Sequence, residues 1–412
     1  MGTNMKSEMD GAQGRSRVVL PVYASAEAFS LFGNAAVQVA LPWLVLQRTG
    51  DPAAAATVAA VTAIAQIVAT VVVGQLIDRF GARRMAIFAD VCSAASVAAL
   101  AFLDTIDVLT FPIILLLAAA GGLFDIPGMT ARQTLLPQIA ERSGRTRDAV
   151  ASIRQGIFGL SLLAGPALTG VLLGVFDAGQ VLWITAACSA LAALATLGIR
   201  VPPVGVDDAE QGIRGAWRTV RQRPILVKLL LVVTISSLVT APLTSVLLPS
   251  HFSELSRPDL LGFTSSALAL GMIAGSGGYV LLARASRRLV WVAALTIPIL
   301  GLVLIASLAG FWLLAIGAAL LGLGAGLVQP LIAVVITERV PGSQLGRVMA
   351  FANALGLVAG PIALGATVLL VDAAGLTALA WAIVAAWVLM ALIGLTGRGQ
   401  RELEAPEASA RS

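Results

Sequence analysis

Long apolar stretches recur along almost the whole 412-residue chain, and they limit its fold more than any other feature. A helix that crosses a bilayer needs about 20 apolar residues. Twelve stretches meet this requirement: residues 18–46, 53–76, 85–103, 110–137, 149–175, 179–199, 225–249, 260–283, 289–309, 311–337, 346–371 and 375–396. Only 12% of the residues are charged, whereas soluble domains carry about 25%. We therefore predict an all-α membrane protein with twelve transmembrane helices.

The positions of arginine and lysine predict how these spans are oriented. If the N-terminus lies in the cytoplasm and the spans alternate, the loop cations gather on the cytoplasmic side, and only Arg48 and Arg257 fall outside. Cytoplasmic loops are enriched in positive residues, and one missed span would scramble this bias. We therefore predict a multi-pass protein of the cytoplasmic membrane with both termini in the cytoplasm.

A polar segment in the middle of the chain divides the spans into six and six. Within it, Ile213, Trp217 and Val220 recur at the spacing of one helix face, with arginines on the other positions. This pattern predicts a short amphipathic helix on the cytoplasmic membrane surface. The predicted organisation is a cytoplasmic tail (1–17), a six-helix bundle (18–199), a linker with the amphipathic helix (200–224), a second six-helix bundle (225–396) and a cytoplasmic tail (397–412).

The two halves also share landmarks at a nearly constant offset. Pro127 in the fourth span corresponds to Pro330 in the tenth, and Gly165-Pro166 in the fifth corresponds to Gly360-Pro361 in the eleventh. Internal repeats of this kind are typical of secondary transporters. The spacing therefore predicts that the two bundles are related by pseudo-symmetry.

The most specific motif follows the second span and reads Gly74-Gln75-Leu76-Ile77-Asp78-Arg79-Phe80-Gly81-Ala82-Arg83-Arg84. Gly74 permits close helix contact, and Gly81 lets the chain reverse because glycine adopts a positive φ at little cost. Asp78 is an anion at a helix end, where it can pair with arginine or with the N-terminus of another helix. Each residue type therefore has a physical use at a membrane surface.

This segment resembles the loop signature G-x-L-x-D-R-x-G-[RK]-[RK] of the major facilitator superfamily, with Ala82 where a basic residue is more usual. The resemblance implies two six-helix bundles around a central cavity that opens alternately to each side. It also implies a cytoplasmic gate in which Asp78 bonds across the bundle interface. The gate residues are then Gly74, Asp78, Arg79, Gly81, Arg83 and Arg84. Leu282 stands at the position of Asp78 in the second half, so the gate is expected to be asymmetric.

Within the superfamily, the sequence is similar to bacterial drug, macrolide and siderophore exporters. The similarity rests on Gly33-Asn34, on Ala40-Leu41-Pro42-Trp43, on Phe124-Asp125-Ile126-Pro127, and on Gly159, Gly165, Pro166 and Gly170 in the fifth span. The last group partly matches the Gly-Pro signature of antiporters, with Gly360 and Pro361 as its counterpart. A proline frees a backbone carbonyl and kinks a helix, so the same residues are equally consistent with a packing kink unrelated to transport direction. Arg154-Gln155-Gly156 resembles another antiporter signature but lies on the fifth span instead of the fourth, and we assign it no role.

Two carboxylates within the spans are candidates for proton binding. Ionisable residues inside a membrane are costly and therefore mark function by default. Glu27 lies in the first span and Asp125 near the middle of the fourth, and the resemblance implies that both helices line the cavity. A carboxyl group in apolar surroundings favours its protonated form, so either could exchange a proton. The alternatives are structural: Asp125 could pair with Arg132, and Glu27 with a cation deeper in the cavity.

Three further polar residues of the first half have both a structural and a functional interpretation. Asn34 and Gln38 could offer hydrogen bonds to the cargo or join helices to one another. Asp90, near the cytoplasmic end of the third span, is expected to bridge to the arginines of the neighbouring loop.

The rare residue types exclude several chemistries. Lys6 and Lys228 are the only lysines and neither follows a glycine, so the chain has no phosphate-binding loop of the G-x-x-x-x-G-K-[ST] type. His251 is the only histidine, which excludes a paired-histidine metal site. Cys92 and Cys188 lie in apolar runs, where cysteine usually acts as a small packed residue. We expect no metal and no cofactor other than a proton gradient, and the net charge of +5 reflects cytoplasmic arginines instead of nucleic-acid binding.

The sequence thus predicts a secondary active transporter, not an enzyme, that exports a lipophilic small molecule such as an antibiotic. Proton antiport with alternating access is the expected mechanism. The few polar residues in the spans of the second half suit an apolar cargo better than a sugar. We expect a monomer whose partners are the substrate, protons and the lipid bilayer. An importer or uniporter of the same fold is the alternative, and a membrane enzyme or sensor is the weaker one.

Overall fold

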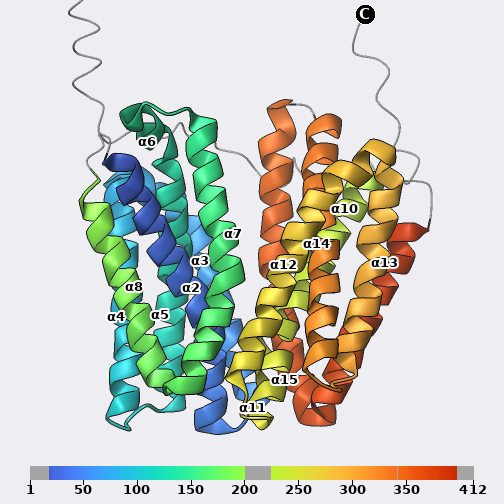
Figure 1. The fold of residues 1–412 in the computed structure, drawn as a ribbon, viewed down its shortest axis with the longest axis horizontal. Helices are drawn as coiled ribbons and strands as arrows, with labels where there is room; N and C mark the ends of the chain where they lie inside the picture. Colours follow the sequence, from blue (N-terminus) through green and yellow to red (C-terminus); the bar gives the residue numbers. More distant parts are fainter. Residues whose placement is uncertain (1–17, 200–223, 341, 397–412) are drawn as a thin grey trace, which may run out of the picture. The chain divides into compact units, whose positions relative to one another are not determined.

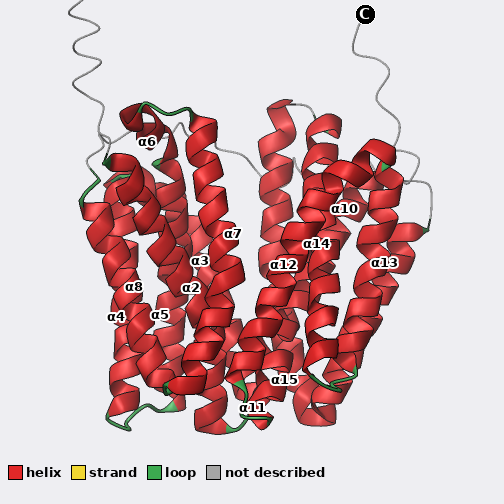
Figure 2. Cartoon of the chain, viewed as in Figure 1, coloured by secondary structure: helices red, strands yellow, loops and turns green. Residues whose placement is uncertain are grey.

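A computed structural model describes residues 18–199, 224–340 and 342–396, and this part of the chain consists of helices joined by short loops (Figures 1 and 2). Eleven of its helices are long and apolar enough to cross a membrane. The last of them is interrupted at Gly375, whose φ of 77° and ψ of −179° are not helical, so it comprises two crossings. The predicted all-α fold with twelve transmembrane helices is confirmed.

The first six spans and one short surface helix occupy the chain up to residue 199. They are α2 (Val19–Thr49), α3 (Pro52–Phe80), α4 (Ala82–Thr105), α5 (Phe111–Thr134), the short α6 (Leu136–Ser143), α7 (Arg147–Val175) and α8 (Ala178–Leu197). We call the end of these helices at which α6 lies the α6 end. Helices α2, α4 and α7 begin there, and α3, α5 and α8 end there (Figure 1).

The remaining spans follow after residue 223. They are α10 (Pro224–Pro242), continued by the π-helical turn η1 (Leu243–Leu247) and by α11 (Leu248–Glu254), then α12 (Pro258–Ala285), α13 (Arg287–Ala306), α14 (Phe311–Arg339) and α15 (Gly342–Leu395). The predicted spans agree with these bounds to within a few residues, because apolar length fixes where a helix can cross. The predicted amphipathic helix and both predicted tails lie outside the described residues.

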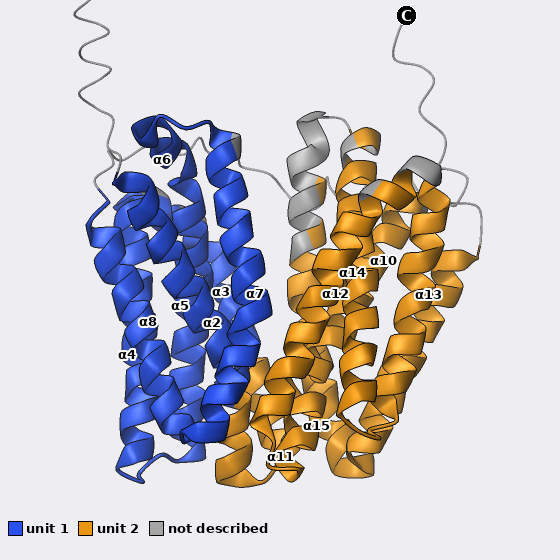
Figure 3. Ribbon diagram, in the orientation of Figure 1, with its two compact units in different colours: residues 1–41, 61–207 blue, residues 42–60, 208–412 orange. Residues whose placement is uncertain are grey.

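By their contacts, the residues form two compact units (Figure 3). The first comprises residues 1–41 and 61–207, and the second comprises 42–60 and 208–412. Residues 42–60, where α2 ends and α3 begins, therefore group with the second unit. The predicted bundles (18–199 and 225–396) follow the order of the spans in the chain, whereas these units follow contacts.

The turn from α3 to α4 needs only one residue outside the helices. Gly81 adopts a φ of 83°, a conformation that costs little for glycine and more for other residues. Its N–H donates to the carbonyl of Ile77 at 2.7 Å. The predicted chain reversal at Gly81 is confirmed.

The second unit is held together by close backbone packing. Helices α12 and α14 meet at Gly271 and Gly275 on one side and Gly322 and Gly326 on the other, where an added Cβ would overlap the backbone of the opposite helix. Small residues four apart permit this approach in membrane helices. The ion pairs described within this unit are partly exposed and lie at helix ends. In the first unit, Glu27, Asp90 and Arg132 are buried and Arg154 is 13% exposed.

Candidate functional site

Four helices of the first unit each bring one charged side chain to a shared, buried position. These side chains are Glu27 of α2, Asp90 of α4, Arg132 of α5 and Arg154 of α7, and we call them the charge cluster. Glu27, Asp90 and Arg154 each lie seven or eight residues inside their helices from the α6 end. A rise of 1.5 Å per residue places them about 11 Å along the helix. The cluster is electrically balanced, with two acids and two cations.

Arg132 is the centre of the charge cluster. Its Nη1 lies 2.6 Å from Asp90 Oδ2, and its Nε lies 3.9 Å from Glu27 Oε1. Its Nη2 donates a short hydrogen bond to Ser30 Oγ, and Ser30 in turn donates to Asp90 Oδ1 at 3.4 Å. The side chain is only 1% exposed, so its charge depends on these partners and not on water.

Glu27 connects Arg132 to Arg154. Its Oε1 lies 3.2 Å from Arg154 Nε and accepts a hydrogen bond from the Tyr23 hydroxyl at 3.2 Å. The same hydroxyl is 3.3 Å from the carbonyl of Arg132, to which it can also donate. Glu27 Oε2 is buried and has no hydrogen-bond partner among the described residues. The carboxylate therefore retains one oxygen that can accept a further proton or hydrogen bond.

Asp125 lies apart from the charge cluster, deeper along α5. It precedes Arg132 by seven residues, which is about 10 Å along the helix. Ser93 Oγ of α4 donates to its Oδ1 at 3.5 Å, and no described cation forms an ion pair with it. The alternative in which Asp125 pairs with Arg132 is wrong, because Arg132 turns instead to Asp90 and Glu27.

The ion pairs also decide the expectations for Asp90 and Glu27. Asp90 was expected to bridge to the loop arginines, but its side chain is buried and pairs with Arg132 across the α4–α5 contact. Glu27 does pair with cations, Arg132 and Arg154, as its structural alternative predicted, and the place of these cations in a cavity stays a prediction. In the sequence, Arg154 stands out only within a signature on the wrong span, to which we assign no role, although an arginine within a span is itself a signal of function.

The predicted polar residues Asn34 and Gln38 follow Glu27 by seven and eleven residues. This spacing places all three on one face of α2. Asn34 is half-buried and Gln38 is exposed. They are therefore placed to extend the polar face of α2 from the charge cluster toward the other end of the unit.

The loop motif divides into residues with different contacts. Arg83 donates to the carbonyls of Thr196 and Leu197, at 3.4 and 2.6 Å, and so satisfies the last turn of α8. The Arg79 guanidinium lies 5.5 Å from the centre of the Phe80 ring, and Arg84 is exposed. Gly74 and the side chain of Asp78 lie outside the described set, so the proposed bond of Asp78 stays a prediction.

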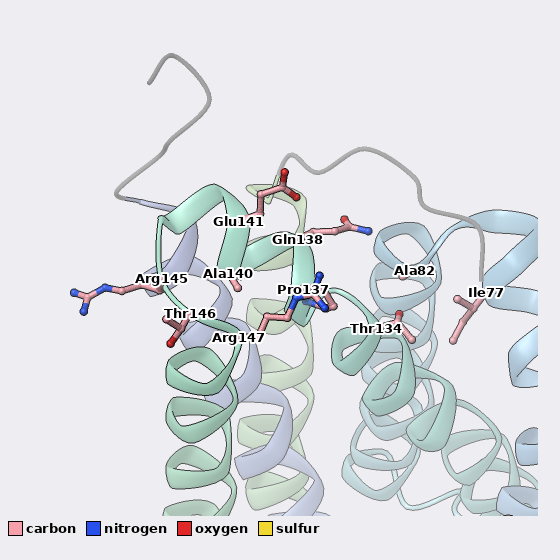
Figure 4. Close-up of a pocket in the computed structure, with 10 residues that line it drawn as sticks. All are labelled: Ile77, Ala82, Thr134, Pro137, Gln138, Ala140, Glu141, Arg145, Thr146 and Arg147. Carbon is pink, nitrogen blue, oxygen red and sulfur yellow. The ribbon is translucent and has the colours of Figure 1, made fainter. Parts of the chain in front are cut away.

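A pocket of about 600 Å³ opens at the α6 end (Figure 4). Gln138 and Glu141 of α6 border it, together with Arg147 at the start of α7. In the close-up, Arg147 points toward Pro137, whereas Arg145 points away. The pocket is lined by none of the four residues of the charge cluster.

The Gly-Pro segments of the two halves match in sequence but differ in their contacts. In α7, a Cβ added to Gly165 would lie 2.6 Å from the Cβ of Ala35, so α7 and α2 approach closely there. The corresponding Gly360, which precedes Pro361, has Ala241 Cβ at 3.7 Å, an ordinary contact. Gly159 faces open space, and Gly170 and Pro166 are buried within an unbroken helix. Of Gly159, Gly165 and Gly360, only Gly165 is therefore required to be glycine for packing.

We expect Gly165→Ala to lower the unfolding temperature of the purified protein in detergent, whereas Gly360→Ala leaves it nearly unchanged. Overpacking a close contact costs about 1–3 kcal/mol, and only Gly165 offers no room for a methyl group. Thermal unfolding followed by fluorescence measures both variants. Equal unfolding temperatures for the two variants would contradict the role of the α2–α7 approach.

Comparison with known proteins identifies the family of this chain. The family model described as Major Facilitator Superfamily matches residues 23–297. The chain is 31% identical over 405 residues to the multidrug efflux pump Tap of Mycolicibacterium fortuitum, covering 95% of this chain and 98% of that protein. It is 23% identical over 285 residues to macrolide efflux protein A of Streptococcus pyogenes, covering 65% and 67% of the two chains.

Solved structures agree on the fold. The nucleoside transporter NupG matches with a TM-score of 0.70 at 16% identity, covering 91% of this chain and 98% of that one. A D-xylose-proton symporter matches with a TM-score of 0.70 at 14% identity, covering 95% and 100%. The chain belongs to the Major Facilitator Superfamily. It is a multi-pass membrane transporter, not an enzyme, and the predicted similarity to bacterial drug and macrolide exporters is confirmed.

Proposed function

We propose that this protein exports lipophilic small molecules, including antibiotics, from the cytoplasm across the cytoplasmic membrane in exchange for protons. The α6 end faces the cytoplasm in this proposal, as the positive loops predict. Similarity to the multidrug efflux pump Tap over almost the whole chain supports drug export. Alternating exposure of a single site would couple the two fluxes.

The proposal of proton coupling rests on the position of Asp125 apart from any described cation. It lies within a span, its described hydrogen-bond partner is the neutral Ser93, and it has no described ion-pair partner. A carboxylate without a fixed counter-charge is energetically unfavourable in any state of the transporter in which water cannot reach it. Binding a proton removes that cost, so the protonation of Asp125 can follow the access of water to the site.

Glu27 serves a different purpose in this proposal. Arg154 and Arg132 both face its Oε1, so a fixed positive charge compensates the carboxylate. The charge cluster then ties α2, α4, α5 and α7 together and carries the state of Asp125 to these helices. Asp125 accepts a hydrogen bond from Ser93, which follows Asp90 on α4 by three residues, and it shares α5 with Arg132, so these two helices would link the two sites.

Cargo recognition would rest mainly on apolar contacts. The ion pairs described within the second unit, Arg257 with Asp259 and Arg287 with Glu338, lie at helix ends and are partly exposed. Asn34 and Gln38 would add hydrogen bonds from α2. A binding surface with few polar partners favours lipophilic molecules over sugars.

Membrane vesicles of known orientation test the proposal. We expect inside-out vesicles that contain the protein to accumulate the lipophilic dye ethidium when their lumen is acidic, and to release it when a protonophore collapses the gradient. Vesicles without the protein are the control. Accumulation only in right-side-out vesicles would indicate an importer, and accumulation indifferent to the gradient would indicate a uniporter; either result overturns the proposal.

A further inference from the structure

A second cavity of the first unit is an apolar groove of about 390 Å³ between α3, α4 and α5. Val72 and Phe80 of α3 border it, with Phe88 of α4 and Phe124 of α5. Phe88 and Phe124 pack edge to face, with ring centres 5.6 Å apart. Phe80 and Phe88 are about half exposed, at 48% and 55%, so the groove is open along its side. We call it the lateral groove.

The lateral groove begins at the α6 end and runs toward the middle of the span. Along α3 its lining extends from Phe80, the last residue of the helix, back to Ala69. Eleven residues of helix are about 16 Å long, which is close to half of the roughly 30 Å hydrocarbon thickness. An extended chain lying in the groove would therefore cover one leaflet.

One charged residue, Arg84, lines this groove. It lies in the first turn of α4, at the mouth of the groove, and its side chain is exposed. The neighbouring Arg83 is already bound to the carbonyls that end α8. Among residues whose side chains the structure describes, no acid pairs with Arg84. The groove therefore combines a long apolar floor with one cation at the membrane surface.

We propose that the lateral groove binds one acyl chain of an acidic phospholipid, whose headgroup phosphate contacts Arg84. Arginine and phosphate form two parallel charge-assisted hydrogen bonds. A zwitterionic phospholipid carries an ammonium group of its own, which lowers its net attraction to Arg84. A lipophilic cation would be repelled at the mouth. This assignment depends on the membrane location of the protein and not on the direction or coupling of transport.

The amount of each lipid that the purified protein binds and retains tests the assignment. Wild-type protein in detergent is incubated with equal amounts of phosphatidylglycerol and phosphatidylcholine that carry the same acyl chains, and native mass spectrometry measures the bound lipid. We expect phosphatidylglycerol to be retained about fivefold more, from roughly 1 kcal/mol for one basic residue at the membrane surface. Arg84→Gln should remove this preference. Arg145→Gln, an exposed arginine at the same end outside the groove, is the matched control and should keep it.

A second variant separates the apolar groove from the charge. Val72→Trp places a bulky side chain in the groove and should reduce retention of both lipids, while the unfolding temperature reports that the protein is folded. Equal retention of the two lipids by the wild type would overturn the proposal, as would an unchanged preference in Arg84→Gln. Displacement of phosphatidylglycerol by glycerol phosphate at millimolar concentration would assign the site to a free phosphate group instead.

Discussion

Replacing Arg132 by methionine is expected to lower the free energy of unfolding by about 3–5 kcal/mol and to abolish transport. Removing one partner of a buried ion pair leaves the opposite charge uncompensated, which costs about this much. Here two carboxylates, Asp90 and Glu27, lose a cation at once, and neither is open to water. Thermal unfolding in detergent and the vesicle assay would measure the two effects.

Two companion variants show whether charge, rather than lost packing, causes the effect. Arg154→Met should destabilise less, because its side chain is 13% exposed and Glu27 keeps Arg132 nearby. Adding Asp90→Asn to Arg132→Met should recover part of the stability, since it removes one of the stranded charges. If the double variant were no more stable than Arg132→Met alone, uncompensated charge would not be the cause.

Asp125→Asn is expected to reduce proton-driven ethidium accumulation at least tenfold without a comparable loss of stability. Asparagine keeps the size of the side chain and can still accept from Ser93 Oγ, but it cannot exchange a proton. Exchange of labelled for unlabelled dye across the membrane without a pH gradient should continue, because it needs no proton release. Loss of proton-driven accumulation with retention of dye exchange is the result specific to a residue that couples proton and dye transport.

The controls for Asp125 use its neighbours. Ser93→Ala removes a hydrogen bond of 3.5 Å and should change accumulation little, and Asp125→Glu should restore part of it. Glu27→Gln is expected to impair both accumulation and exchange, because it disturbs the contacts of Arg132 and Arg154. If Asp125→Asn accumulated dye like the wild type, and Glu27→Gln lost proton-driven accumulation but kept dye exchange, the proton would be assigned to Glu27.

The sequence predicted that Glu27 and Asp125 lie within transmembrane helices, but it did not predict which residues surround them. Glu27 and Asp125 stand out because each interrupts an apolar span, and the cost of charge in lipid makes such interruptions informative. Their different surroundings did not follow from the chain. Arg132 lies on the same helix as Asp125 at a helical spacing, yet its partners lie on α4 and α2, 42 and 105 positions away.

The sequence by itself determined the number of crossings, the reversal at Gly81 and the family, because hydrophobic length and glycine conformation act locally. Tertiary structure alone decided which charges pair and which of the two matched Gly-Pro glycines leaves no room for a side chain. Gly165 and Gly360 have the same neighbours in sequence, but only Gly165 faces another helix at close range. An ion pair or a close approach depends on which faces of separate helices meet, and that is set by packing across the whole unit.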